Sequence, residues 1–274
     1  MALKKYTTAE SITPHDTNTL GVTPDAIYVG EGNWTEELGR ADLFNPIFWI
    51  DQSNQSSFGI AGGGSETGDI ETIVNQGTSL TNLAVIDDPN RGGPVRVVAD
   101  ASCKTKYMTF EANKGLKVAN HADLDFGTDA FEFMVVYRQS ATSEGWSGGK
   151  TLIAREDTSD RWEFRIDSSA EGSDLRMYQD GTDAESGVDV SDQDWRIVGF
   201  SRSATGFGGI RNHRIWIDGV AVSSQQITAV DFDADASQDL FIGHDDAVAS
   251  DFGGHMADVI IWDKELEDDE RAYM

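Results

Sequence analysis

From Pro46 onward the chain is built of short apolar runs that are separated by turn-forming residues, with no long helical period between them. Several runs alternate apolar and polar residues. In 162–166 the apolar side chains are predicted to share one face of a strand, while Glu163 and Arg165 share the other. Many short strands of this kind indicate an all-β fold. The sequence therefore predicts antiparallel strands that form a sandwich of two stacked sheets.

Turn residues separate the individual strands. Candidate strands cover residues 47–50, 95–99, 107–110, 116–118, 131–138, 151–155, 162–166, 175–178, 195–201, 213–217, 240–242 and 255–262. Asp218-Gly219 favours positive φ angles and predicts a two-residue type I′ hairpin turn. Trp216 points away from its two isoleucine neighbours, so it is either core covered by a loop or an exposed platform. Only residues 264–273 have a helical pattern, with Asp263 placed to cap it.

The charge of the chain is strongly acidic. Asp and Glu outnumber Lys and Arg by 48 to 21, which gives a formal net charge of -27. Long-range repulsion from phosphates therefore disfavours nucleic-acid binding. The acidity fits a salt-rich setting, abundant divalent cations near the surface, or docking onto a basic partner.

Cysteine content and hydropathy bound the setting of the protein. The single cysteine, Cys103, cannot form an intrachain disulfide and is expected to be a small, at least half-buried apolar residue. No apolar stretch follows Lys4 and Lys5, and no segment reaches the roughly 18 apolar residues of a membrane span. We expect a product made in the cytoplasm without a signal peptide and without membrane contact.

The first 45 residues differ from the rest of the chain because they are polar and rich in turn residues. Within them Ile27, Tyr28 and Val29 form the one strand-like run, and an isolated strand is marginal unless it pairs with another sheet edge. We therefore predict two parts: an anchoring arm over 1–45 and a sandwich over 46–274. The alternatives are a disordered leader or an arm folded back on its own sandwich.

The order of motifs in the second half carries a family resemblance. A strand begins at Trp195, the next strand candidate ends in Asp218-Gly219, an Ile242-Gly243 strand follows, and the closing strand runs to Trp262. This order resembles the laminin-G-like branch of the concanavalin A-like lectin/glucanase superfamily. The resemblance implies a jelly-roll sandwich in which the first strand, within 44–51, lies beside the closing strand. It is nearly silent on activity, because this fold hosts lectins, hydrolases, adhesion modules and virion parts.

A second resemblance lies in the arm. The segments Thr13-Pro14-His15-Asp16-Thr17 and Ala26-Ile27-Tyr28-Val29-Gly30 are similar to the start of phage virion proteins, notably spike bases. This similarity implies a virion structural protein, as a capsid decoration, fibre or spike subunit, whose arm binds other virion proteins while the sandwich faces outward. A homo-oligomer at a symmetry axis is then expected. The alternatives are a free glycan-binding lectin-like module and a polysaccharide-degrading enzyme.

Catalytic and metal motifs are weak in this sequence. A retaining glucanase of this superfamily carries Glu-x-Asp-x-x-Glu on one strand, and that motif is absent. The nearest string places Glu163 and Asp167 on a face that we interpret as solvated, so no enzyme activity is predicted. The five histidines lack metal-ligand spacing. Calcium is the most credible metal, with Asp231, Asp233 and Asp235 as ligands, although aspartates in acidic loops are usually only solvated.

Aromatic residues supply the candidate glycan contacts, because sugars bind to aromatic faces with polar groups nearby. Trp146 lies in a Gly- and Ser-rich loop with no other apolar residue and is the first candidate. The alternative is that Trp146 covers the sandwich edge. Trp216 is the second candidate. The remaining strand tryptophans are expected in the core: Trp49, Trp162, Trp195 and Trp262.

Overall fold

The structure is a computed structural model, and it describes most of the chain from Phe44 onward. The described ranges are 44–51, 58–60, 68–78, 84–88, 94–99, 106–111, 114–127, 129–140, 150–156, 161–169, 172–179, 182–204, 210–228, 238–245 and 251–271. Pro46–Glu265 form one compact unit. The residues from Leu266 onward belong to a second unit and are described by themselves.

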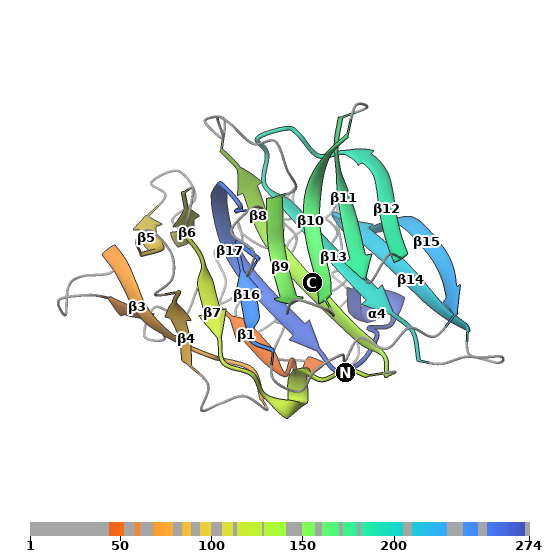
Figure 1. Cartoon of the computed structure of the whole chain (residues 1–274), viewed down its shortest axis with the longest axis horizontal. Helices are drawn as coiled ribbons and strands as arrows, with labels where there is room; N and C mark the ends of the chain where they lie inside the picture. Colours follow the sequence, from red (N-terminus) through yellow and green to blue (C-terminus); the bar gives the residue numbers. More distant parts are fainter. Residues whose placement is uncertain are drawn as a thin grey trace, which may run out of the picture. The chain divides into compact units, whose positions relative to one another are not determined.

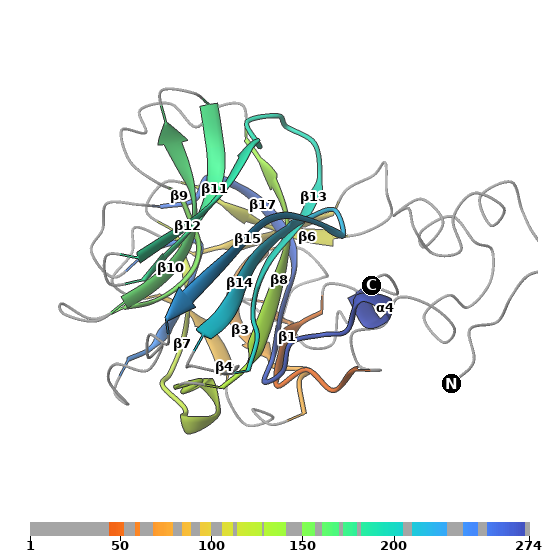
Figure 2. The same ribbon diagram turned by 90° about the vertical axis from the view of Figure 1, so that its right-hand side faces the viewer.

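The compact unit is an antiparallel β-sandwich, as the alternating pattern predicts (Figures 1 and 2). Sheet 1 has the strand order β5 (Arg96–Ala99), β6 (Lys106–Phe110), β17 (Gly254–Trp262), β8 (Phe131–Gln139), β13 (Arg196–Arg202), β14 (Ile210–Ile217) and β15 (Val220–Thr228), and β1 (Phe48–Ile50) also pairs with β17. Sheet 2 has the order β12 (Thr182–Asp189), β11 (Gly172–Gln179), β10 (Arg161–Ser169), β9 (Lys150–Glu156), β16 (Leu240–Ile242), β7 (Leu116–Val118), β4 (Ala84–Asp87), β3 (Gly68–Val74) and β2 (Phe58–Ile60). Strand β3 also pairs with β5, so one strand joins the two sheets at this end.

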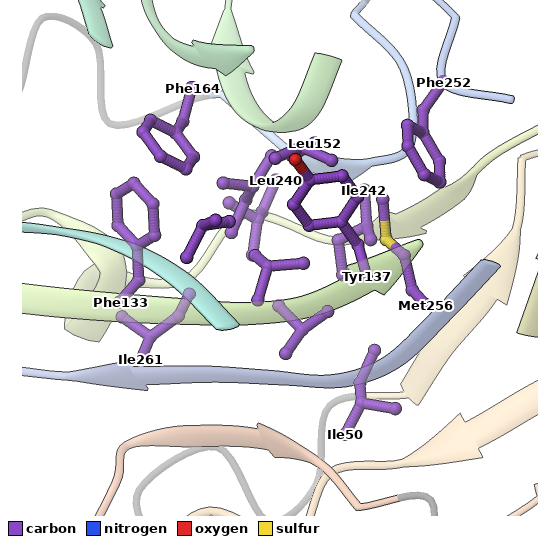
Figure 3. Packing of buried hydrophobic residues seen from close by; sticks show 14 of the residues in the cluster. Ile50, Phe133, Tyr137, Leu152, Phe164, Leu240, Ile242, Phe252, Met256 and Ile261 are labelled. Atoms are coloured by element: carbon purple, nitrogen blue, oxygen red, sulfur yellow. The ribbon is translucent and has the colours of Figure 1, made fainter. Parts of the chain in front are cut away.

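The core lies between the two sheets and is centred on aromatic rings. Phe133 on β8 lies 5.8 Å from Trp162 and 5.2 Å from Phe164 on β10, between ring centroids. Its ring is also 5.8 Å from that of Phe200 on β13. Because alternate residues of each strand point inward, the aromatic and aliphatic side chains of both sheets interdigitate there (Figure 3).

Two predictions, one of a strand pair and one of a turn, are confirmed. Strand β1 lies beside β17, with Trp49 opposite Ile260, as the family resemblance implies (Figure 1). The β14–β15 hairpin turns at Asp218 and Gly219, whose φ angles of 49° and 78° are those of a type I′ turn.

The prediction for the end of the chain is wrong in extent. Helix α4 spans only Asp268–Arg271 among the described residues, so it begins later than expected and Asp263 is not its cap. Arg271 at its C-terminal end is held in place, since its guanidinium donates a hydrogen bond to the Leu266 carbonyl at 2.5 Å and pairs with Asp268 at 2.9 Å. No helix in the described part of the chain is long and apolar enough to cross a membrane.

Several strands have little apolar alternation and were not expected, namely β2, β3, β4, β12 and β15. Strand β12 has the sequence TDAESGVD, and β15 contains Ser223, Ser224, Gln225 and Gln226. Both lie at the edge of a sheet, where few side chains face the core. Backbone pairing with the neighbouring strand, which the apolar pattern does not report, defines them.

Candidate functional site

The outer face of sheet 1 carries an aromatic and basic cluster that the sequence pattern did not reveal. Tyr137 on β8 and Met256 on β17 point into the core. Their neighbours Arg138 and His255 therefore point outward, because adjacent residues of a strand lie on opposite faces of the sheet. His255 pairs in register with Arg138. With Tyr107 and Trp195 these two residues form the set that we call the aromatic–arginine cluster: Tyr107, Arg138, Trp195 and His255.

The rings of the cluster surround the guanidinium group. The Arg138 guanidinium carbon lies 5.1 Å from the Trp195 ring centroid and 5.8 Å from that of Tyr107. The Tyr107 and Trp195 rings are 5.7 Å apart at 62°, and Tyr107 lies 4.6 Å from His255. All four side chains are half-buried, so each keeps part of its surface open to solvent. Cation–π attraction and backing by a sheet hold this surface in one arrangement.

The neighbouring contacts fix the edge of the cluster. Thr109 Oγ1 and His255 Nδ1 are 3.4 Å apart, which orients the imidazole on β17. Among the described residues the Arg138 guanidinium has ring contacts only, with no carboxylate and no carbonyl as partner. An aromatic wall with an unneutralised cation at its centre is suited to bind a polar ligand with an apolar face.

The outer face of sheet 2 is a second polar surface, and the prediction that Glu163 is solvated there is wrong. Glu163 is 0 % exposed. Its Oε1 accepts a hydrogen bond from Thr151 Oγ1 at 2.5 Å, and its Oε2 lies 3.0 Å from the Arg165 guanidinium. The side chains of neighbouring strands pack over this carboxylate, and the partners offset the cost of burying it.

The other charges on this face form a chain of ion pairs. Arg165 is 3.4 Å from Asp167, Arg176 is 2.9 Å from the same carboxylate, and Arg176 also pairs with Glu185. Desolvation, strengthened by the nearby Glu185, raises the pKa of Asp174. Each carboxylate that pairs here is held by arginine, and the pairs link side chains of β10, β11 and β12.

This sandwich is similar to a known family of proteins. The profile of a laminin-G-type family, described as "Concanavalin A-like lectin/glucanases superfamily", matches residues 111–270, which is more than half of the chain. The chain belongs to this superfamily. A comparison with curated protein sequences found no match.

Solved structures share the fold of this superfamily member at low sequence identity. Domain 4 of AbnA, a GH43 extracellular arabinanase from Geobacillus stearothermophilus, in complex with arabinotriose, has a TM-score of 0.53 and 14 % identity over 73 % of this chain and 90 % of that chain. The binding domain of botulinum neurotoxin DC, in complex with rat synaptotagmin II, matches 84 % of this chain with a TM-score of 0.54 and 13 % identity. The same domain in complex with SialylT has a TM-score of 0.54 and 13 % identity over 82 % of this chain. The chain spans about half (50 %) of each toxin domain.

In this lectin-like sandwich Trp216 adopts one of the two environments predicted for it, whereas Trp195 departs from its predicted place in the core. Trp216 is 8 % exposed, its indole N–H donates to Ser201 Oγ at 3.0 Å, and the Arg214 guanidinium lies over its ring at 6.0 Å. The covered alternative therefore holds, and Trp216 offers no open ring to a sugar. Trp195 was expected in the core but lies half-buried on the outer face.

The remaining tryptophans and candidate residues divide into described and undescribed positions. Trp162 is in the core as predicted, Trp262 is fully buried on the opposite side of β17 from Ile261, and Trp49 is half-buried with its indole N–H 3.4 Å from Asp258. The following residues lie outside the described ranges and stay predictions: Ile27, Tyr28, Val29, Cys103, Trp146, Asp231, Asp233 and Asp235. Within the described ranges, no group of at least three His, Cys, Asp or Glu side chains could hold a metal ion.

One signal in the sequence could have located the cluster. Val198 and Phe200 are core residues, so a strict period of two places residues 195, 197 and 199 on the outer face of β13. The same phase on β8 puts Arg138 outward beside the inward Tyr137. The prediction for Trp195 was wrong because an apolar run alone does not show which alternate residues of the strand point inward.

Proposed function

We propose that this lectin-like sandwich is a glycan-binding module without catalytic activity, and that it binds sugar through the aromatic–arginine cluster. The observation that carries this proposal is the pair of half-buried rings, Tyr107 and Trp195, held at 62° around Arg138 on a sheet face. The C–H face of a sugar ring packs on such rings, while guanidinium and hydroxyl groups bind its oxygens. A β-sheet supplies the rigid backing that such a site needs.

The absence of catalysis is supported by the chemistry of sheet 2. A retaining glycosidase needs one carboxylate as nucleophile and one carboxylic acid as proton donor. Glu163 is buried with its oxygens engaged by Thr151 and Arg165, and Asp167 is paired with Arg165 and Arg176. Neither carboxylate is placed to attack a sugar.

Domains of the same fold give additional support to the binding proposal. The arabinanase domain is in complex with arabinotriose, and one toxin binding domain is in complex with SialylT. At 13–14 % identity these likenesses concern the fold, so the location of the site in this chain rests on its own residues.

We also propose that the module belongs to a virion, where residues 1–45 bind other virion proteins and the sandwich faces outward as part of a homo-oligomer. The support is the similarity of residues 13–17 and 26–30 to phage spike bases. A polar segment that orders on a partner can bury a large surface, and its strand can complete a sheet edge. The test is co-purification with particles. Removal of 1–45 should abolish attachment while the sandwich still folds.

A glycan array followed by calorimetry tests the binding site. Trp195→Ala and Tyr107→Ala should each weaken binding of the selected glycan by about tenfold, the loss expected for one ring contact. Tyr178→Ala is the matched control, because Tyr178 is a half-buried aromatic residue on the outer face of sheet 2. A Trp146→Ala variant tests the loop prediction in the same assay.

Three results would contradict the proposal. Failure of the protein to bind any glycan removes the binding function. Loss of binding in Tyr178→Ala but not in Trp195→Ala moves the site to sheet 2. Release of reducing sugar from a bound polysaccharide, lost on Glu163→Gln, identifies an enzyme instead.

A further inference from the structure

Arg138 differs from the other arginines of this acidic chain. Arg96 lies 2.9 Å from Asp69, Arg214 lies 3.3 Å from Glu265, and Arg196 lies 2.7 Å from Asp218. Among arginines with described side chains, those paired with carboxylates are Arg96, Arg155, Arg165, Arg176, Arg196, Arg214 and Arg271, and Arg202 is bound by backbone carbonyls. Arg138 is the exception, because its described contacts are aromatic rings. Among the arginines with described side chains, Arg138 thus differs in having neither a carboxylate nor a carbonyl as partner of its guanidinium, although the net charge of the chain is -27.

The groups around Arg138 are hydrogen-bond donors. The Tyr107 hydroxyl and the Trp195 indole N–H make no hydrogen bond to any described residue, and both side chains are half-buried beside the guanidinium. A guanidinium offers five N–H donors and no acceptor, and an indole offers one donor. The cluster therefore presents several donors and a positive charge, and no described carboxylate forms an ion pair with Arg138.

We infer that the aromatic–arginine cluster selects an anionic saccharide, one that carries a carboxylate or a sulfate ester. This inference rests on the proposed function and adds the charge of the ligand to it. The planar guanidinium of Arg138 binds the two oxygens of the anionic group side by side, and the sugar ring packs against Trp195. Tyr107 and Trp195 hold the guanidinium through cation–π contacts, so little side-chain freedom is lost on binding.

The acidic charge of the chain does not prevent this recognition. At physiological ionic strength the Debye length is about 8 Å, so carboxylates on remote parts of the surface are largely screened. Contacts at hydrogen-bond distance are screened much less. Some of the described carboxylates are also neutralised by ion pairs with other arginines, as Asp192 and Asp218 are by Arg196.

Matched pairs of saccharides that differ in charge test the inference. Oligogalacturonide is compared with its methyl ester, sialyllactose with lactose, and sulfated lactose with lactose, each titrated into the full chain by calorimetry. In at least one pair the anionic member should bind about tenfold more tightly, the gain expected for a charge-assisted bidentate contact. The carboxylate and sulfate arms identify which anion is preferred.

Variants at Arg138 assign the preference to the cluster. Arg138→Gln should bring the affinity for the anionic sugar to within about twofold of that for its neutral partner, and Arg138→Lys should keep part of the difference. Arg96→Gln is the matched control, because Arg96 is also on sheet 1 but is paired with Asp69, and it should keep the full preference. Circular dichroism and urea unfolding of each variant show whether the fold is intact.

The outcomes separate this inference from the proposed function. If neutral and anionic sugars bind equally and Trp195→Ala abolishes both, the charge selection is wrong and the glycan site stands. If the anionic preference survives Arg138→Gln, charge is recognised elsewhere and the inference is overturned. If no sugar of either kind binds, both the inference and the proposed function fail.

Discussion

Replacing Tyr137 by phenylalanine should stabilise the protein. Tyr137 is 1 % exposed and lies in the core beside Phe252, with ring centroids 5.9 Å apart (Figure 3). Its hydroxyl is buried and has no hydrogen-bond partner among the described residues. A buried polar group without a partner costs free energy, because in the unfolded chain water binds it.

The size of the effect follows from two opposing contributions. Removing an unsatisfied buried hydroxyl recovers about 1–3 kcal/mol. The gap left by one oxygen is smaller than a methyl group and costs less than about 1 kcal/mol. We therefore expect Tyr137→Phe to raise the free energy of unfolding at pH 7 by about 1 kcal/mol.

The difference should grow in alkaline solution. Burial raises the pKa of Tyr137 above its usual value of 10, so the folded chain keeps the proton at a pH where the unfolded chain releases it. The folded state then binds more protons than the unfolded state, and stability falls as pH rises above 10. This loss is about 1.4 kcal/mol per pH unit and is absent from the variant. The advantage of Tyr137→Phe over the wild type should therefore widen above pH 10.

Urea unfolding followed by tryptophan fluorescence measures both effects between pH 7 and pH 11. Tyr107→Phe is the control, because Tyr107 is half-buried and should show no comparable gain. A loss of more than about 1 kcal/mol in Tyr137→Phe at pH 7 would refute the reasoning, because it would show that the hydroxyl has a partner. A constant difference across the pH range would refute the account of the buried proton.

Three further predictions concern the core, a turn and a salt bridge. Phe133→Ala should cost about 3–5 kcal/mol in urea unfolding, whereas exposed Val74→Ala should stay within about 0.5 kcal/mol; equal effects would contradict the assigned core. Gly219→Ala should cost about 1–2 kcal/mol by the same measurement, because its φ is 78° while a Cβ there meets no atom within 4 Å; no loss would mean that the turn relaxes. Hydrogen bonds from Arg196 lower the pKa of Asp192 in the folded state. Asp192→Asn should therefore lower the free energy of unfolding by less than about 1 kcal/mol above about pH 4, and this difference should disappear as the pH falls further. A difference between the two proteins that persists at pH ~2 in an acid titration of unfolding would disprove this.

The alternation of residues accounts for most of the sandwich. The inward phase of Phe131, Phe133 and Phe164 could be predicted, because core packing requires every second side chain of a strand to be apolar. The pairing of β1 with β17 followed from the order of motifs in the superfamily. Edge strands such as β12 could not be predicted, because their backbone pairs with one neighbour and their side chains are mostly polar.

The candidate site was less accessible to sequence reasoning. Tyr107, Arg138, Trp195 and His255 come from four separate segments, and only the register of the strands brings them together. Glu163 shows the same limit. Its alternation phase was read correctly, but its burial depends on Thr151 and Arg165 packing around it.

Trp195 and Trp216 show what the sequence alone determines and what depends on the tertiary structure. Both point to the outer face of sheet 1, and the sequence determines that phase because adjacent residues on a strand point to opposite sides. Tertiary structure adds the cover of Trp216, since Ser201 from the neighbouring strand accepts its N–H, while Arg214, two residues away on the same strand, lies over its ring. Trp195 stays half-buried beside Arg138. Exposure depends in part on side chains from neighbouring strands, and the local sequence pattern does not show which of these side chains come into contact.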